Sequence, residues 1–144
     1  MKIFLDTNVL MDIIFQRDKD NPHFDSETNI IACAKDGIIE CAVSALSIVN
    51  TVYVAKKYKM QPDDVKSALS QLTECVEFVD VKGKDASDIL KSSDWKDYED
   101  GIQYSSAANY GADYILTRNC KDFKPSDITI CTPSEFIATM DSKE

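Results

Sequence analysis

The sequence has little of what zinc sites and disulfide frameworks require. His23 is the single histidine, and the 5 cysteines are odd in number and contain no Cys-x-x-Cys pair. Structural and catalytic zinc sites are built mainly from histidine and cysteine, so a zinc site is not expected. The cysteine pattern suits a reducing compartment better than a disulfide framework. A lone histidine in no visible Ser/His or Cys/His motif also argues against nucleophilic catalysis.

Long apolar runs, glycine-rich phosphate loops and low-complexity stretches are absent as well. A membrane span needs roughly 20 apolar residues, and the apolar residues after Lys2 are too few for a signal peptide. We therefore expect a cytoplasmic protein with no membrane association. At 144 residues, with 44% hydrophobic and 28% charged residues, the chain is expected to fold as a single domain over residues 1–144 without disulfides.

Positive charge is scarce, and the formal net charge is −9. This argues against general nucleic-acid binding, because affinity for phosphate comes mainly from lysine and arginine. It does not exclude nucleic acid if the acids gather around one metal pocket, since local basic groups can still hold a phosphate backbone. Arg118, Lys121 and Lys124 are the candidate contacts, whereas the cluster from Lys56 to Lys59 is interpreted as solvated surface.

Short apolar segments alternate with segments of helical period, and this predicts an α/β fold with a parallel sheet of about five strands. Helix signals agree: Gly37 and Gly111 suit helix C-caps, Pro62 suits a first turn, and Thr132–Glu135 fits a capping box. The predicted strands are Lys2–Leu5, Ile38–Val43, Val76–Val81, Tyr114–Leu116 and Ile128–Cys131.

Polar and acidic side chains follow these strands. Ligands bind at the carboxyl ends of strands in parallel sheets, so side chains placed there are expected to meet at one edge. The residues concerned are Asp6 after the first strand, Ser44 and Asn50 after the second, Asp97 and Asp100 at the start of the helix before the fourth, and Thr117–Asp122 after the fourth.

Carboxylates gathered at one edge indicate a divalent-metal site. Two carboxylates about 4 Å apart repel by roughly 4 kcal/mol at an effective dielectric near 20, and a hard cation such as Mg²⁺ or Mn²⁺ relieves that repulsion. Such an ion suits phosphodiester hydrolysis. Each acid also has a structural interpretation, since Asp6, Asp97 and Asp100 could simply cap or favour helix N-termini. Asp12, on the polar side of the first helix, is predicted to be plain surface.

Three segments together resemble one known family. Leu5–Leu10 reads LDTNVL, Asp97–Tyr104 reads DYEDGIQY, and Thr117–Phe123 reads TRNCKDF. Their order, their spacing and the chain length resemble the PIN-domain family, and the resemblance covers nearly the whole chain.

The resemblance implies a PIN-like three-layer α/β/α sandwich and a Mg²⁺- or Mn²⁺-dependent ribonuclease, often the VapC-type toxin of a toxin–antitoxin pair. It implies RNA as substrate and an antitoxin protein as partner, and it leaves a homodimer open. Asp6, Asp100 and Asp122 match the catalytic metal-binding acids, and Asp97 is a further acid of some branches. The supporting polar residues are Asn8, Ser44, Asn50, Thr117 and Asn119.

One position departs from the family pattern. The family has an acid, usually glutamate, in the helix after the second strand, where this chain has Asn50. An amide binds a hard cation more weakly, although Asp97 could compensate from one helical turn before Asp100. Asn50 therefore favours an alternative function, a PIN-like module that binds RNA or protein with little catalysis. A phosphatase of the haloacid-dehalogenase type is a third alternative, but it needs a second Asp where this chain has Asn8.

Overall fold

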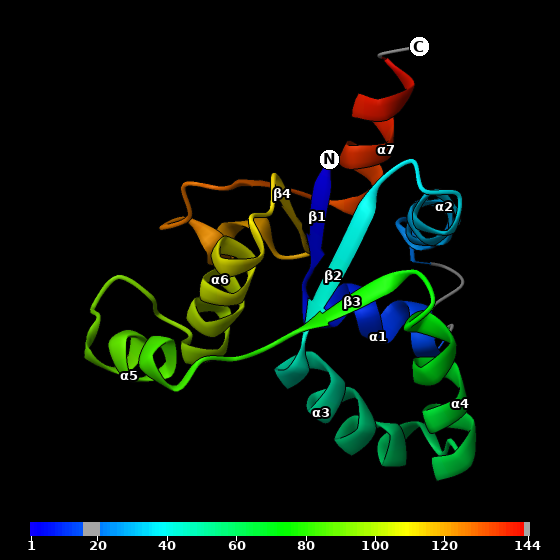
Figure 1. Cartoon of the computed structure of the whole chain (residues 1–144), viewed down its shortest axis with the longest axis horizontal. Helices are drawn as coiled ribbons and strands as arrows, with labels where there is room; N and C mark the ends of the chain where they lie inside the picture. The colour runs from blue at the N-terminus through cyan, green and yellow to red at the C-terminus, as the bar shows by residue number, and fades with distance from the viewer. Residues whose placement is uncertain (16–20, 143–144) are drawn as a thin grey trace.

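The structure is a computed structural model that describes residues 1–15 and 21–142. Parallel strands form one sheet in the order β3-β2-β1-β4-β5 (Figure 1), which confirms the predicted α/β class. β1 lies in the centre, so its carboxyl end is flanked by β2 and β4. The strands are β1 (Lys2–Leu5), β2 (Glu40–Ser44), β3 (Val76–Val79), β4 (Tyr114–Leu116) and β5 (Thr129–Cys131).

Helices connect the strands and cover both faces of the sheet. They are α1 (Thr7–Phe15), α2 (Phe24–Lys35), α3 (Ala45–Val54), α4 (Pro62–Leu72), α5 (Gly83–Lys91), α6 (Tyr98–Tyr110) and α7 (Pro133–Asp141). Two short 3-10 helices are η1 (Ala55–Tyr58) and η2 (Cys120–Phe123). None of the helices within residues 1–15 and 21–142 is long and apolar enough to cross a membrane.

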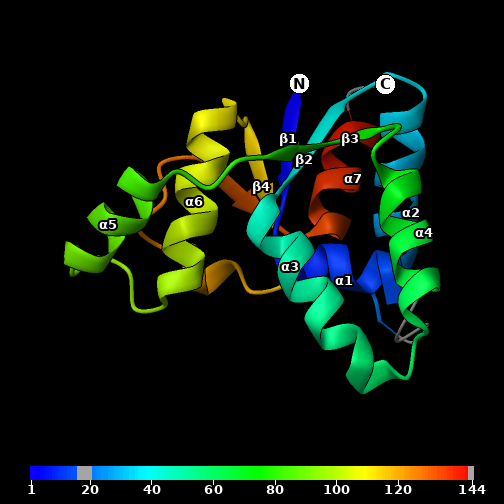
Figure 2. The ribbon, with the colours of Figure 1, turned by 60° about the horizontal axis from the view of Figure 1, so that its bottom comes forward.

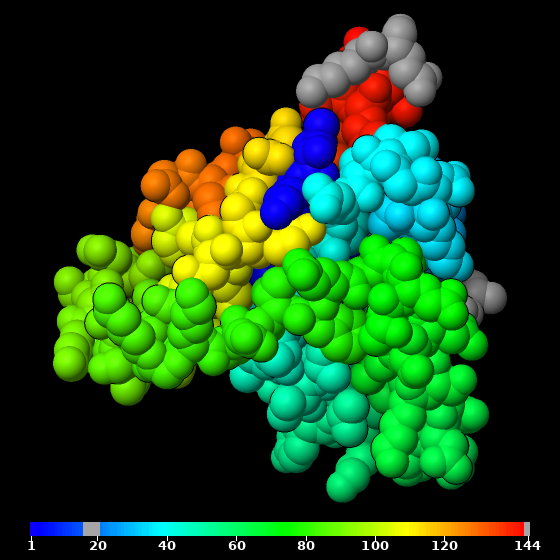
Figure 3. All heavy atoms as spheres, in the orientation of Figure 1, coloured from blue at the N-terminus to red at the C-terminus, as the bar shows by residue number. Residues whose placement is uncertain are grey.

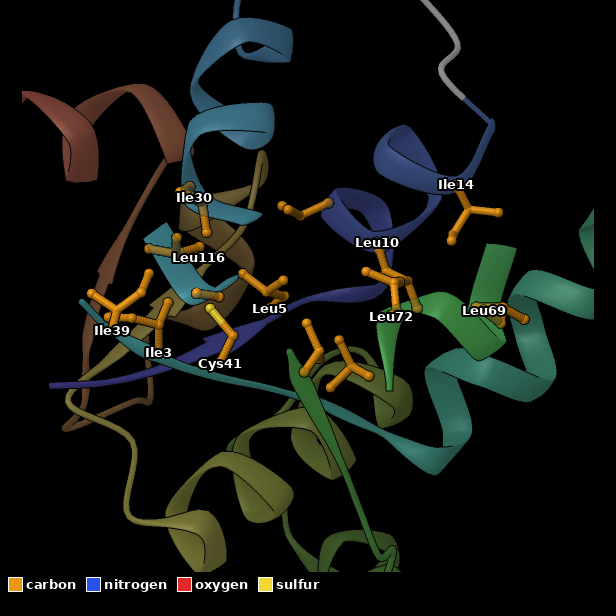
Figure 4. Packing of buried hydrophobic residues seen from close by; sticks show 14 of the residues in the cluster. Ile3, Leu5, Leu10, Ile14, Ile30, Ile39, Cys41, Leu69, Leu72 and Leu116 are labelled. Carbon is orange, nitrogen blue, oxygen red and sulfur yellow. The ribbon is translucent and has the colours of Figure 1, made fainter. Parts of the chain in front are cut away.

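Strand alternation divides the core into two layers. Ile3 and Leu5 point to one face of β1, where they pack with α1, α2, α4 and α7 (Figure 4). Phe4 points to the other face and packs with Ala107 of α6 and with Phe123. α5 contacts α6 and lies at the periphery, on the side of the molecule away from α2 and α4 (Figure 3). The three-layer α/β/α arrangement is therefore confirmed.

The predicted helix ends are confirmed, but four strand ends differ, among them the end of β2 at Ser44 rather than Val43 and the start of β5 at Thr129 rather than Ile128. Gly111 is left-handed with φ 82°, and Thr132 and Glu135 form the capping box of α7. β2 begins at Glu40 rather than Ile38, because the Ile38 amide still donates to the Cys33 carbonyl of α2 at 2.9 Å. β3 ends at Val79 rather than Val81, since its pairing with β2 ends where Ser44 meets Val79.

The carboxyl ends of the strands meet the starts of α1, α3 and α6 and of the loop after β4. Figure 2 looks toward this edge, where α1 and α3 begin. α6 runs antiparallel to β4, so its first turn returns to the same edge. Segments far apart in the sequence thus place their polar residues side by side, as the strand pattern predicts.

Candidate active site

Asp6 lies at the centre of this edge, in the single residue between β1 and α1. Its backbone amide donates to the Leu116 carbonyl of β4 at 2.9 Å, which extends the sheet by one residue. The Thr7 amide donates to its Oδ1 and the Thr117 hydroxyl donates to its Oδ2, each at 2.8 Å. Burial raises the pKa of Asp6 to about 6, because these two hydrogen bonds offset the desolvation only in part.

The first turn of α6 brings three more carboxylates to the edge. Asp97 is the N-cap, and its Oδ1 accepts from the Asp100 amide at 3.1 Å. Burial, followed by the charges of Asp6 and the other nearby acids, raises the pKa of Asp100 to about 7. Glu99 lies between them, and its Oε1 accepts from the Thr7 hydroxyl at 3.2 Å and from the Asn50 amide at 2.9 Å.

The loop after β4 completes the edge through Thr117. The Thr117 hydroxyl, which donates to Asp6, accepts from the Asn8 amide at 3.2 Å and from the Asn119 backbone amide at 3.1 Å. The loop then enters η2, which carries Asp122, and the Asp122 charge contributes to the raised pKa values of both Asp6 and Asp100. The Thr117 hydroxyl therefore links Asp6, the buried acid that follows β1, to the loop that carries Asp122.

These side chains form two adjoining hollows. We name the first, of about 400 Å³, the acidic hollow. The second, of about 500 Å³, is the lysine hollow, and Asp97, Asp100 and Asp122 line both. The acidic hollow is lined by Asp6, Thr7, Asn8, Met11, Asn50, Tyr53, Val54, Asp97, Glu99, Asp100, Asn119 and Asp122. The lysine hollow is lined by Asp94, Lys96, Asp97, Asp100, Lys121, Asp122, Lys124 and Pro125.

A buried polar network supports the acidic hollow from beneath. The Gln103 amide of α6 donates to the Thr7 hydroxyl at 2.5 Å and to the Ser47 hydroxyl at 2.7 Å. Thr7 and Ser47 are themselves 2.7 Å apart, and all three side chains are buried. α1, α3 and α6 are thus joined by hydrogen bonds directly below the carboxylates.

The structure brings most of the predicted site residues together. Thr117 lies beneath the acidic hollow against Asp6, and Lys121 and Lys124 line the lysine hollow. Ser44 is buried outside both hollows, where its hydroxyl caps α3 by accepting from the Ser47 amide. The remaining predicted residues, apart from Arg118, line the acidic hollow: Asp6, Asn8, Asn50, Asp97, Asp100, Asn119 and Asp122.

Sequence reasoning missed Glu99 and the network below it. Glu99 and Gln103 are four residues apart on α6 and therefore share a helix face, so the spacing contained a usable signal. Lys96, just before the helix, was also missed although it lines the lysine hollow.

The prediction that Asp12 is plain surface is wrong. Asp12 is 0% exposed, and its Oδ2 lies 3.0 Å from Nε of Arg118 and 3.1 Å from the Asn21 amide. α2 covers this side of α1 and adds Glu27, whose pKa burial and the Asp12 carboxylate raise to about 9. Arg118, a candidate RNA contact, is consequently held by Asp12 and lines neither hollow.

The donor chemistry of the acidic hollow fits a hydrated divalent ion. Within residues 1–15 and 21–142, no three His, Cys, Asp or Glu side chains are close enough to enclose a metal by themselves. Mg²⁺ does not require such a cage, because it is commonly held by one or two carboxylates together with waters and substrate phosphate. The acidic hollow offers five carboxylates and no histidine or cysteine, so its donors suit Mg²⁺ or Mn²⁺ rather than zinc.

Comparisons with known proteins agree with the fold. Residues 2–121 match the family described as PIN domain. The chain is 28% identical over 142 residues to "Ribonuclease VapC1" of Aquifex aeolicus, covering 94% of this chain and 92% of that protein. The crystal structure of VapBC2 from Rickettsia felis bound to a promoter DNA fragment is similar, with a TM-score of 0.65 and 22% identity, over 92% of this chain and 98% of that chain. A toxin–antitoxin complex from Klebsiella pneumoniae has a TM-score of 0.64 and 19% identity, over 91% of this chain and 97% of that chain.

Proposed function

Since this chain belongs to the PIN-domain family, we propose that it is a ribonuclease that hydrolyses RNA phosphodiester bonds with Mg²⁺ or Mn²⁺. The observation that carries the proposal is the acidic hollow, where five carboxylates from three separate segments face one space at the carboxyl edge of the sheet. The resemblance to a protein named as a ribonuclease supports RNA as the substrate.

Asp6, Asp100 and Asp122 would hold the ion, with Asp97 beside them. When bound, the ion supplies an acidified water and neutralises charge on the phosphoryl group. Asp6 is oriented for this role, because the Thr7 amide and the Thr117 hydroxyl each fix one of its oxygens. Asn8 and Asn119 hold that hydroxyl in turn and line the hollow, where they are placed to orient phosphate or water.

We also propose that the protein is the toxin of a toxin–antitoxin pair. The solved structures with this fold include VapBC2 and a toxin–antitoxin complex, which supports an antitoxin as protein partner. The binding module with little catalysis is less favoured, because Glu99 supplies a carboxylate beside Asn50.

The test is cleavage of a labelled single-stranded RNA with Mg²⁺, with Mn²⁺ and with EDTA. Wild type is expected to cleave only with the ion, and Asp6→Asn or Asp100→Asn should lower the rate about 100-fold or more through loss of a charged ligand. Asp88→Asn on α5 is the matched control, because Asp88 is exposed and lines neither hollow. Activity that persists in EDTA and in Asp6→Asn would contradict the proposal.

A further inference from the structure

The two hollows share one acidic wall but differ in the charge of their other residues. The lysine hollow adds Lys96, Lys121 and Lys124 to the shared acids, together with one further acid, Asp94. The acidic hollow has no basic residue in its lining and adds Asp6 and Glu99 to the same acids. A strand of RNA that crosses the shared wall would therefore meet lysine side chains on one side and carboxylates without any basic residue on the other.

Tyr53 is the aromatic side chain on the acidic side. It belongs to α3, is 71% exposed, and lines the acidic hollow together with Met11 and Val54. Neighbouring apolar side chains of α3 are exposed too, with Val49 at 64% and Val52 at 44%. An exposed ring on the rim of a hollow offers a flat apolar face to whatever enters it.

Charge determines which part of RNA can approach that ring. Five carboxylates repel phosphate from the acidic hollow except at the bound cation, whereas an uncharged base meets no such repulsion. The lysine hollow favours phosphate, because each lysine that contacts the backbone releases counterions. Base stacking on an aromatic side chain contributes about 1–3 kcal/mol per base.

We propose that Tyr53 stacks on one unpaired base beside the cleaved phosphodiester, while the lysine hollow holds the phosphates on the other side of it. The inference rests on the proposed ribonuclease function and adds a residue that contacts the substrate base. The base next to the cleavage point must be unpaired for this contact, since a base inside a duplex is not available to the ring. Tyr53 is thus a residue that touches substrate and selects it.

An abasic scan of a short single-stranded RNA tests the inference. Abasic nucleotides are placed one at a time on either side of the mapped cleavage point, and kcat/KM is measured for wild type and variants. For wild type, one abasic position should lower kcat/KM about tenfold, the equivalent of 1.4 kcal/mol. Tyr53→Ala should lower cleavage of intact RNA by a similar factor and remove the sensitivity to that position, whereas Tyr53→Phe should keep it.

Two further variants separate stacking from general effects. Val49→Ala truncates a similarly exposed side chain of α3 outside both hollows and should leave the scan unchanged. Lys121→Gln should weaken binding of all substrates alike and reduce the salt dependence, without changing which abasic position matters. Because Tyr53 is 71% exposed, Tyr53→Ala is expected to melt like wild type.

Failure of the inference is distinct from failure of the proposed function. If wild type cleaves with metal but Tyr53→Ala cleaves equally well, or shows the same abasic profile, the stacking proposal is overturned and the nuclease stands. That result would instead favour an acidic hollow that binds a basic side chain of a protein partner. If wild type cleaves nothing, quenching of a 2-aminopurine base in bound RNA still tests stacking: quenching by wild type and by Tyr53→Phe but not by Tyr53→Ala supports it, and equal quenching overturns it.

Discussion

At the scale of single residues, the departure at Asn50 is explained by its partner. The Asn50 amide donates to Oε1 of Glu99 at 2.9 Å, so an amide on α3 and an acid on α6 form one pair at the rim of the acidic hollow. The resembled family has its acid on the helix that carries Asn50. In this chain, a carboxylate reaches the same place from the opposite helix.

Exchanging the two side chains tests this explanation. Asn50→Glu alone should lower the free energy of unfolding in EDTA by roughly 1–2 kcal/mol, because it replaces a hydrogen bond with two facing carboxylates. Adding Glu99→Gln should restore most of that loss, since the amide and the acid have then changed places at constant charge. Urea denaturation measures both. A double variant no more stable than Asn50→Glu would show that the pair is not the reason for the amide.

At the scale of elements, α1 and α2 enclose acids that take no part in lining the hollows. Asp12 and Glu27 are 0% and 1% exposed, and the Asn21 amide donates to both, at 3.1 Å and 3.0 Å. Arg118 reaches this pair from the loop after β4, while its backbone amide donates to Asn8 at 3.3 Å. The junction of α1 and α2 therefore anchors the loop whose continuation carries Asp122.

The raised pKa of Glu27 makes the free energy of unfolding depend on pH through this junction. The pKa is raised from 4.5 to about 9, so between these values the folded protein keeps a proton that the unfolded chain has lost. The stabilisation from this proton is complete below pH 4.5, declines as the pH rises above that value, and is gone above about pH 9. Asp6 and Asp100 titrate in the same direction, but at about 6 and about 7. Glu27 should thus account for the fall in stability between about pH 7 and pH 9.

Glu27→Gln is the variant that isolates this contribution. The amide stays neutral at every pH, can donate to Asp12, and can still accept from Asn21, so the fold should persist. Urea denaturation from pH 6 to pH 9.5 should show a decline for wild type that is absent or clearly flatter for Glu27→Gln above pH 7. If the stability of both proteins declined equally with pH, the group that loses its proton would not be Glu27.

At the scale of the whole molecule, an excess of negative charge is concentrated where it opposes folding. The formal net charge is −9, and five carboxylates face the acidic hollow. A divalent ion that binds only the folded protein relieves this repulsion and stabilises it by mass action.

The melting temperature should therefore rise with Mg²⁺ or Mn²⁺ at pH 8. At about 100 times the dissociation constant the ion adds about 2.7 kcal/mol, and at about 3 °C per kcal/mol this is a rise of roughly 8 °C. The rise should shrink at pH 5, because protons compete for Asp6 and Asp100, whose pKa values are about 6 and about 7.

Two controls accompany the melts. NaCl at matched ionic strength accounts for screening, and the double variant Asp6→Asn with Asp100→Asn removes two of the five carboxylates of the acidic hollow. If wild type and the double variant shift equally, the ion does not bind at the acidic hollow.

The local sequence pattern was sufficient to predict the helices and strands and much of the candidate site. The apolar segments predicted every strand of the sheet to within a few residues, and Gly111 and Thr132 marked helix ends through their own backbone chemistry. Asp6 and Asp100 could be placed at one edge because parallel strands all end on the same side of a sheet. These are consequences of short-range periodicity and of one rule of topology.

Whether the other polar residues are buried or face the acidic hollow depends on which helices pack against one another. Asp12 and Glu99 look alike in the sequence, as acids within helical segments, yet α2 buries Asp12 while Glu99 faces the acidic hollow. The bonds that decide this join residues far apart in the chain, such as Thr7 and Gln103, which are 96 positions apart. Sequence alone therefore determined the sheet and its acidic edge. Only the tertiary structure decided that Arg118 turns inward and Tyr53 outward, because burial and pairing depend on long-range contacts that no local pattern contains.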